Sequence, residues 1–204
     1  MGEQTITTEV TAHQTHEPEV AIIQGMVFGE DDNPADAEAR VRDRISTVRE
    51  SLTTSTLTQV RATAFQVQEV DDMFGPETEA DFRAEETFKI KCPPDTIEPT
   101  ASEITAAGGT VQGIEFKLYP STHQQLENEV TQTALERARK QAERIAETED
   151  IALAELESVT TTDAARSPTG ITDELLADVE TSGPTMNPVE VSKRVEVIYS
   201  VANE

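Results

Sequence analysis

The chain has 204 residues and a formal net charge of −24, from 40 acidic and 16 basic residues, and it contains only 4% aromatic residues and no tryptophan. A folded chain of this length buries roughly 70% of its unfolded surface, so it can form a hydrophobic core. The acidic balance leaves no basic surface to replace the counterions of a nucleic-acid backbone, so we expect no nucleic-acid partner.

Two strands and a helix are predicted at the start of the chain. Thr5–Ala12 alternates between polar and apolar residues, Val20–Phe28 is the most apolar stretch, and together they predict a hairpin. Asn33 followed by Pro34 is typical of a helix start, and this helix extends to about Thr53. Its apolar stripe at helical spacing consists of Ala37, Val41, Ile45, Val48 and Leu52.

A second hairpin and a short helix follow. Val60–Val70 and Phe82–Cys92 alternate and are joined by the turn-rich loop Asp71–Ala80. Apolar side chains fall on both faces of the first of these strands, which predicts a bulge or burial of both faces. The short helix covers about Glu98–Ala107 and ends at Gly108.

The central stretch Gly108–Glu147 is predicted to be a turn, a strand and a long helix. The strand Val111–Tyr119 ends at Pro120. The helix begins at Ser121 or Thr122, either of which fits a capping box with the glutamine three residues later. Small side chains in its apolar stripe let the helix axis lie close to its neighbour. The stripe consists of Leu126, Val130, Ala134, Ala138, Ala142 and Ile145, with Leu135 beside it.

Two further strands complete an α+β fold. They are Ala152–Thr161 and Val189–Val201, the second with a register change near Ser192, and the loop-like Thr162–Asn187 between them includes a helical turn at Asp173–Val179. The order β-β-α-β-β-α-β-α-β-β predicts antiparallel-rich sheets with helices packed on one face. We expect residues 1–204 to form a single domain, and a division into two intertwined lobes, about 1–92 and 93–204, stays open.

The distribution of charge suggests a salt-rich solvent. The acidic residues are scattered through the chain rather than collected in a tail. Such a surface repels itself in dilute buffer. At molar salt the screening length falls to about 3 Å and the repulsion is largely removed. We therefore interpret the chain as halophilic, with an ordinary acidic mesophilic protein as the alternative.

The sequence indicates a cytoplasmic protein. It contains no run of about 18 apolar residues, so no integral membrane segment is predicted. Met1–Thr8 is polar and acidic and lacks the basic and apolar regions of a signal peptide. We expect a cytoplasmic location unless a leader was removed. Cys92 is the single cysteine, which excludes an internal disulfide and a cysteine-based metal site, and we expect it to be a packed thiol.

No catalytic or metal-binding constellation emerges. His13 and His16 are too few for a zinc site, and strand alternation points them to opposite faces. No serine lies in a nucleophile elbow, and the glycines around Gly108 lack the spacing of a phosphate loop. Paired carboxylates such as Asp71-Asp72 or Glu85-Glu86 carry almost no signal in so acidic a chain. We therefore expect no enzymatic activity, no cofactor and no bound metal.

Two features are candidates for contact with a partner. A quarter of all the basic residues lie in one eight-residue segment of the long helix. They either pair with neighbouring glutamates of the helix or contact an acidic face of another protomer. An apolar pair in the polar loop before Phe82 either covers its own sheet or is a knob for a partner. The residues concerned are Arg137, Arg139, Lys140 and Arg144 in the helix, and Met73 and Phe74 in the loop.

One combination of features extends along essentially the whole chain. It comprises the initial strand pair, the Asn33–Thr53 helix, the turn Ala106–Gly109, the strand Val111–Phe116, the alanines Ala134, Ala138, Ala142 and Ala146, and the final Val195, Val197 and Tyr199. In these residues the chain resembles the SIMPL-domain family of unknown function, as a member of halophilic archaeal type. The resemblance implies an α+β protomer that assembles into large ring- or channel-like oligomers, and it implies no catalytic residues. Many bacterial members are exported and linked to stress defence, whereas this sequence has no export signal.

We therefore expect a non-enzymatic, self-associating SIMPL-like protein that acts as a homo-oligomeric scaffold or binding module. The alternative is a ligand-binding protein or an enzyme whose site forms between protomers. A defined apolar pocket with converging polar groups favours the alternative. A tightly packed protomer with exposed edge strands favours the scaffold.

Overall fold

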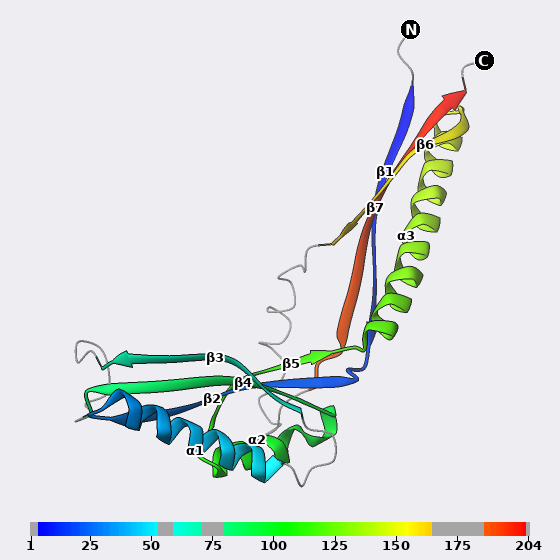
Figure 1. The fold of residues 1–204 in the computed structure, drawn as a ribbon. Helices are drawn as coiled ribbons and strands as arrows, with labels where there is room; N and C mark the ends of the chain where they lie inside the picture. Colours follow the sequence, from blue (N-terminus) through cyan, green and yellow to red (C-terminus); the bar gives the residue numbers. More distant parts are fainter. Residues whose placement is uncertain (1–3, 53–58, 71–79, 165–185, 203–204) are drawn as a thin grey trace, which may run out of the picture. The chain divides into compact units, whose positions relative to one another are not determined.

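The computed structural model describes residues 4–52, 59–70, 80–164 and 186–202. Within them lie seven strands and three α-helices, and their order along the chain confirms the predicted α+β succession (Figure 1). The elements are β1 (Thr5–His16), β2 (Val20–Asp31), α1 (Pro34–Leu52), β3 (Gln59–Glu69), β4 (Phe82–Cys92), α2 (Ile97–Ala106), β5 (Thr110–Lys117), α3 (Pro120–Thr148), β6 (Ala152–Asp163) and β7 (Val189–Ala202). The helical turn predicted at Asp173–Val179 lies outside the described residues.

These elements form two compact units, each with its own antiparallel sheet (Figure 1). The long-helix unit contains β1, α3, β6 and β7, and the four-stranded unit contains the elements from β2 to β5. The first takes residues 1–17, 119–181 and 188–204, and the second takes residues 18–118 and 182–187. These ranges differ from the lobes of about 1–92 and 93–204 that the sequence left open.

The hairpin predicted from the first two strands is wrong. β1 pairs with β7 along its whole length, from Thr5 opposite Ser200 to His16 opposite Val189. β2 instead pairs with β4 on one side and β5 on the other. The burial of the two strands explains the difference. β2 is apolar enough for the middle of a sheet, whereas every second residue of β1 faces solvent, which suits an edge strand with one covered face.

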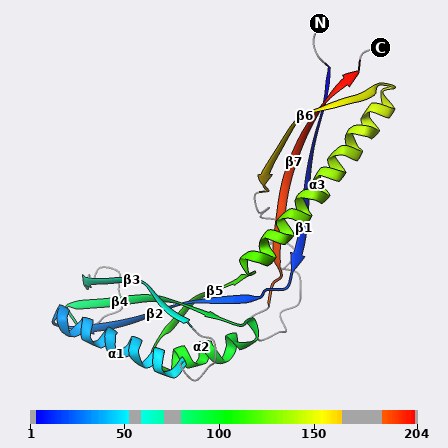
Figure 2. The same cartoon turned by 45° about the vertical axis from the view of Figure 1, so that its right-hand side comes forward.

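In the four-stranded unit, α1 and α2 cover one face of a sheet with the order β3-β4-β2-β5 (Figure 1, Figure 2). The predicted apolar stripe of α1 is confirmed, because all five of its residues are buried. Oδ1 of Asn33 accepts the N–H of Ala35 at 2.9 Å, which confirms the predicted helix start. The second hairpin is also confirmed, since β3 pairs with β4, and β3 contains a bulge between Ala62 and Ala64.

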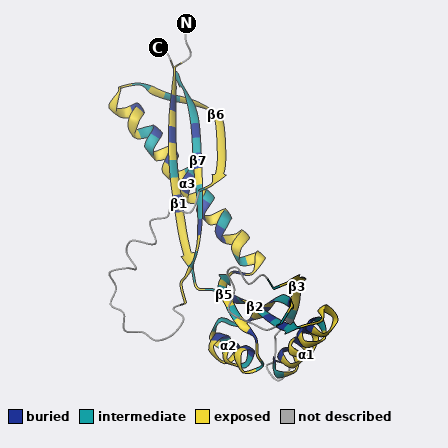
Figure 3. Ribbon diagram, turned by 90° about the vertical axis from the view of Figure 1, so that its left-hand side faces the viewer, coloured by how far each residue is buried: buried dark blue, intermediate teal, exposed yellow. Residues whose placement is uncertain are grey.

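In the long-helix unit, α3 packs on one face of a sheet with the order β1-β7-β6. Figure 3 shows its buried stripe in dark blue. Ala134, Ala138 and Ala142 are fully buried, and the hydroxyl of buried Thr8 on β1 donates to the carbonyl oxygen of Ala138 at 3.0 Å. The close approach predicted from the small side chains is therefore present.

Two predictions about α3 are wrong. The helix begins at Pro120, with Tyr119 as its N-cap, so Ser121 and Thr122 lie in the first turn and not at a capping box. Proline suits the first helical position because its fixed φ is already helical and its missing N–H has no helical partner to lose. At the other end Ile145 is exposed and Ala146 takes the buried position, since it lies four residues after Ala142.

The predicted register change near Ser192 does not occur in the pairing of β7 with β1, which is continuous there. The irregular hydrophobicity of β7 has another cause. Lys193 occupies the face of β7 that also carries buried Val191 and Val195, and its ammonium group is bound by carboxylates. The register shifts of this sheet lie instead in β6, on both sides of Leu156.

Candidate interaction surface

The four cations singled out in the long helix all lie on the exposed part of α3, but the helix separates them. At about 100° per residue, Arg137, Lys140 and Arg144 share one stripe, which we call the basic stripe, while Arg139 lies on another flank. Nε of Arg139 pairs with Oε1 of Glu143 at 2.9 Å, and this hydrogen bond raises the pKa of the Arg139 guanidinium. Pairing within the helix therefore explains Arg139.

The basic stripe is not explained in this way. In the described part of the chain, neither Arg137 nor Lys140 forms an ion pair, and Nε of Arg144 donates to the carbonyl oxygen of Lys140 at 3.4 Å. The amide of Gln132, rather than Lys140, binds the carboxylate of Glu136, at 3.0 Å. The stripe is thus positive charge on a protein of net charge −24. The other candidates, Met73 and Phe74, lie outside the described residues.

Strand β6 was not predicted to be a functional element, yet it is the least protected strand of its sheet. It pairs with β7 on one edge, and nearly all of its residues are exposed on both faces (Figure 3). Leu156 is 51% exposed and Val159 is 42% exposed, because α3 packs mainly over β1 and β7. The residues of β6 from Glu155 to Asp163 are mostly acidic or hydroxyl-bearing, and this polar composition is the local signal that could have identified an exposed edge strand.

A cluster of charges holds the far end of β6 beside β7 and α3. Nζ of Lys193 lies 2.8 Å from Oε1 of Glu127 on α3 and 2.5 Å from Oδ1 of Asp163 on β6. Hydrogen bonds to Asp163 and then to Glu127 raise the pKa of Lys193, and the same Lys193 hydrogen bond lowers the pKa of Asp163. The Lys193 side chain is only 18% exposed, so this cluster fastens strand to helix and is not a free docking group.

The remaining candidates take structural positions. His13 and His16 lie on opposite faces of β1, and Nδ1 of His16 is 2.7 Å from the carbonyl oxygen of Glu17. The described residues hold no group of three His, Cys, Asp or Glu side chains that fits a metal ion. Cys92 is buried in the core of the four-stranded unit, where burial raises the pKa of its thiol. Glu86 pairs with Arg49 of α1 at 3.6 Å, and Asp71 and Asp72 lie outside the described residues.

Gly108 has φ +84°, a left-handed conformation that favours glycine, so the glycines here form the turn before β5. None of the described helices combines the length with the apolar character needed to cross a bilayer.

The model of a family described as SIMPL, protein of unknown function (DUF541), matches residues 6–199. No curated protein matches the chain.

Proposed function

The chain belongs to the SIMPL family, and from that premise we propose that it is a non-enzymatic, self-associating protein that serves as a scaffold or binding module in the cytoplasm of a halophile. The stress-related role implied by the family resemblance is part of the same proposal. The observation that supports the proposal is the exposure and the incomplete pairing of β6. Among the described residues β6 pairs only with β7, and it is exposed on both faces, so its other edge is an open template for another chain.

A second copy of this chain suits that template. Leu156 and Val159 are exposed, and an interface that covers them is stabilised by about 25 cal/mol per Å² of apolar surface buried. The basic stripe adds charge complementarity, because 40 acidic residues make every copy of the chain an acidic partner. Glu155, Glu157 and Asp163 on β6 oppose self-pairing in dilute buffer, so association should strengthen as salt screens them.

Absolute mass by light scattering at molar salt tests the proposal. The wild type should form a discrete oligomer, and Val159→Lys should lower its mass. The matched control is Ile145→Lys, since Ile145 is 36% exposed but lies on helix α3 and on no strand edge. This control should keep the wild-type mass. A wild type that remains monomeric across all salt concentrations would overturn the proposal.

A second variant examines the basic stripe. Reversal of Arg137, Lys140 and Arg144 to Glu should weaken assembly at intermediate salt. The control reverses three exposed cations of the four-stranded unit and changes the net charge equally. These are Arg42, Arg61 and Lys89. Equal effects of the two triple variants would assign the result to net charge and not to the stripe.

A further inference from the structure

Towards its C-terminal end, strand β2 extends beyond the first residue of its antiparallel neighbour β5. The first residue of β5, Thr110, lies opposite Met26, whereas β4 accompanies β2 as far as Asp31. From residue 27 to residue 31, no described strand pairs with β2 on the β5 side. Among the described residues, this part of β2 therefore has one unpaired edge, and it lies in line with β5.

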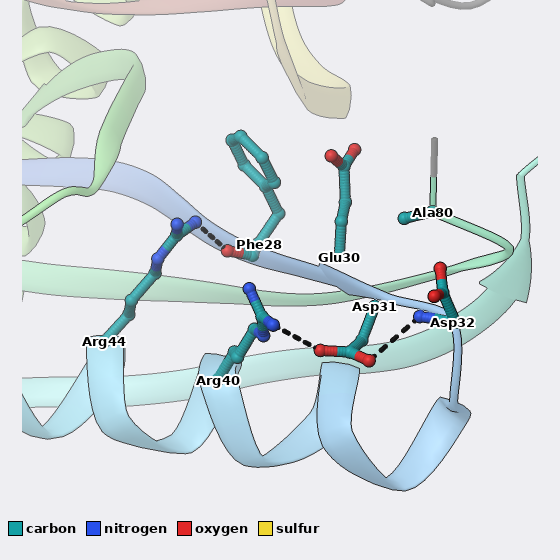
Figure 4. Close-up of a pocket in the computed structure, with 7 residues that line it drawn as sticks. All are labelled: Phe28, Glu30, Asp31, Asp32, Arg40, Arg44 and Ala80. Atoms are coloured by element: carbon teal, nitrogen blue, oxygen red, sulfur yellow. Dashed lines mark hydrogen bonds and ion pairs between the residues drawn. The ribbon is translucent and has the colours of Figure 1, made fainter. Parts of the chain in front are cut away.

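A side chain occupies part of this edge. Nη1 of Arg44, from α1, donates to the carbonyl oxygen of Phe28 (Figure 4). The guanidinium carbon of Arg44 lies 5.2 Å from the centroid of the Phe28 ring. Gly29 lets α1 come this close, since a Cβ there would lie 2.7 Å from the carbonyl oxygen of Ala37. Arg44 thus takes the position that a backbone N–H of a neighbouring strand would take.

A hollow of about 570 Å³ lies beside this edge (Figure 4). Two of its acidic side chains already have cations, since Asp31 pairs with Arg40 and Glu30 pairs with Arg83. The lining residues are Phe28, Glu30, Asp31, Asp32, Arg40, Arg44 and Ala80.

Two charges of the hollow remain uncompensated among the described residues. Arg44 contacts a carbonyl oxygen and a ring, both of them neutral, and Asp32 forms no ion pair. Asp32 directly follows Asp31, the last residue of β2, and so lies just beyond the open edge, four positions after Phe28. An occupant should therefore present a negative group near Phe28 and a positive group near Asp32.

We propose that the edge of β2 from Phe28 to Asp31 binds an extended peptide that adds to the sheet antiparallel to β2. A backbone N–H of the peptide replaces Arg44 on the carbonyl oxygen of Phe28, as in other strand-addition complexes. An acidic side chain of the peptide accepts the released Arg44. A basic side chain about four residues earlier in the peptide lies near Asp32, since a strand antiparallel to β2 passes the C-terminal end of β2 first. This site does not depend on self-association.

Two synthetic peptides of equal composition and zero net charge test the proposal by fluorescence anisotropy with the full chain, at the lowest salt concentration at which its circular dichroism is retained, because salt screens exposed charge pairs. The first is Thr-Lys-Val-Thr-Val-Glu-Thr, and the second exchanges its Lys and Glu. The first should bind about 3- to 10-fold more tightly, the size expected for two exposed charge pairs. It should also slow hydrogen exchange of residues 27–31.

Arg44→Ala should lower the ratio of the two affinities, because it removes one of the two charges that distinguish the peptides, and Arg44→Ala combined with Asp32→Asn should bring the affinities together. Arg42→Ala, on the same helix and paired with Glu38, should leave their ratio unchanged. Equal affinities for wild type, or protection away from residues 27–31, would overturn the proposal. Protection of these residues that rises with protein concentration without peptide would also overturn it, in favour of a second copy at this edge.

Discussion

The close packing of α3 on its sheet gives a prediction with a definite size. Ala138 is fully buried, and its carbonyl oxygen accepts the hydroxyl of Thr8 at 3.0 Å. Ala138→Leu adds an isopropyl group where there is no room, and such overpacking costs about 1–3 kcal/mol. Moving α3 away from β1 also stretches the Thr8 hydrogen bond, which contributes about 1 kcal/mol. We expect a total loss of about 2–4 kcal/mol.

Tyrosine fluorescence is the suitable assay, because it reports on one unit. The chain has two tyrosines and no tryptophan, and both Tyr119 and Tyr199 belong to the long-helix unit. Urea unfolding at constant molar salt should show a midpoint lowered by about 1–2 M. The control Glu136→Leu places the same side chain on the exposed side of α3 and should change stability by no more than about 0.5 kcal/mol.

Equal midpoints for Ala138→Leu and Glu136→Leu would refute the reasoning. They would mean that α3 does not rest on the sheet through its alanine stripe. A large shift in Glu136→Leu alone would mean that the buried side of the helix had been misassigned. Far-UV circular dichroism recorded in parallel shows whether the four-stranded unit unfolds separately.

Three further predictions concern other parts of the molecule. Lys193→Met should cost about 1 kcal/mol at neutral pH, through the lost pair with a carboxylate of α3. The pKa of Lys193 is raised, so the difference from wild type should persist through neutral pH and shrink above about pH 10, as Lys193 loses its proton. A difference independent of pH in urea titrations would contradict this pairing. Gly29→Ala should destabilise the four-stranded unit by about 1–3 kcal/mol, since a Cβ there would lie 2.7 Å from a backbone oxygen of α1, whereas Gly113→Ala meets nothing within 4 Å and should be nearly neutral by thermal denaturation. Stepwise dialysis from molar to dilute salt should abolish the circular dichroism of the folded chain, and full retention of structure would contradict the halophilic interpretation.

The sequence by itself determined the elements and their order. The stripe from Ala37 to Leu52 identified the buried side of α1, and the alternation of Phe82–Cys92 matched β4 at both ends. The sequence also placed four cations within one eight-residue segment of α3, although only the structure showed that Arg139 pairs with Glu143. These signals are readable because helices and strands repeat over a few residues, so that each pattern is complete within its own segment.

The tertiary structure decided which strands pair and which surfaces remain open. β1 lies three residues before β2 and yet pairs with β7, near the other end of the chain. The same pairing leaves β6 at an edge with Val159 exposed. Because β5 begins only opposite Met26, Arg44 can reach the carbonyl oxygen of Phe28. Pairing depends on complementary edges and faces that distant segments offer each other, whereas periodicity describes only one segment at a time.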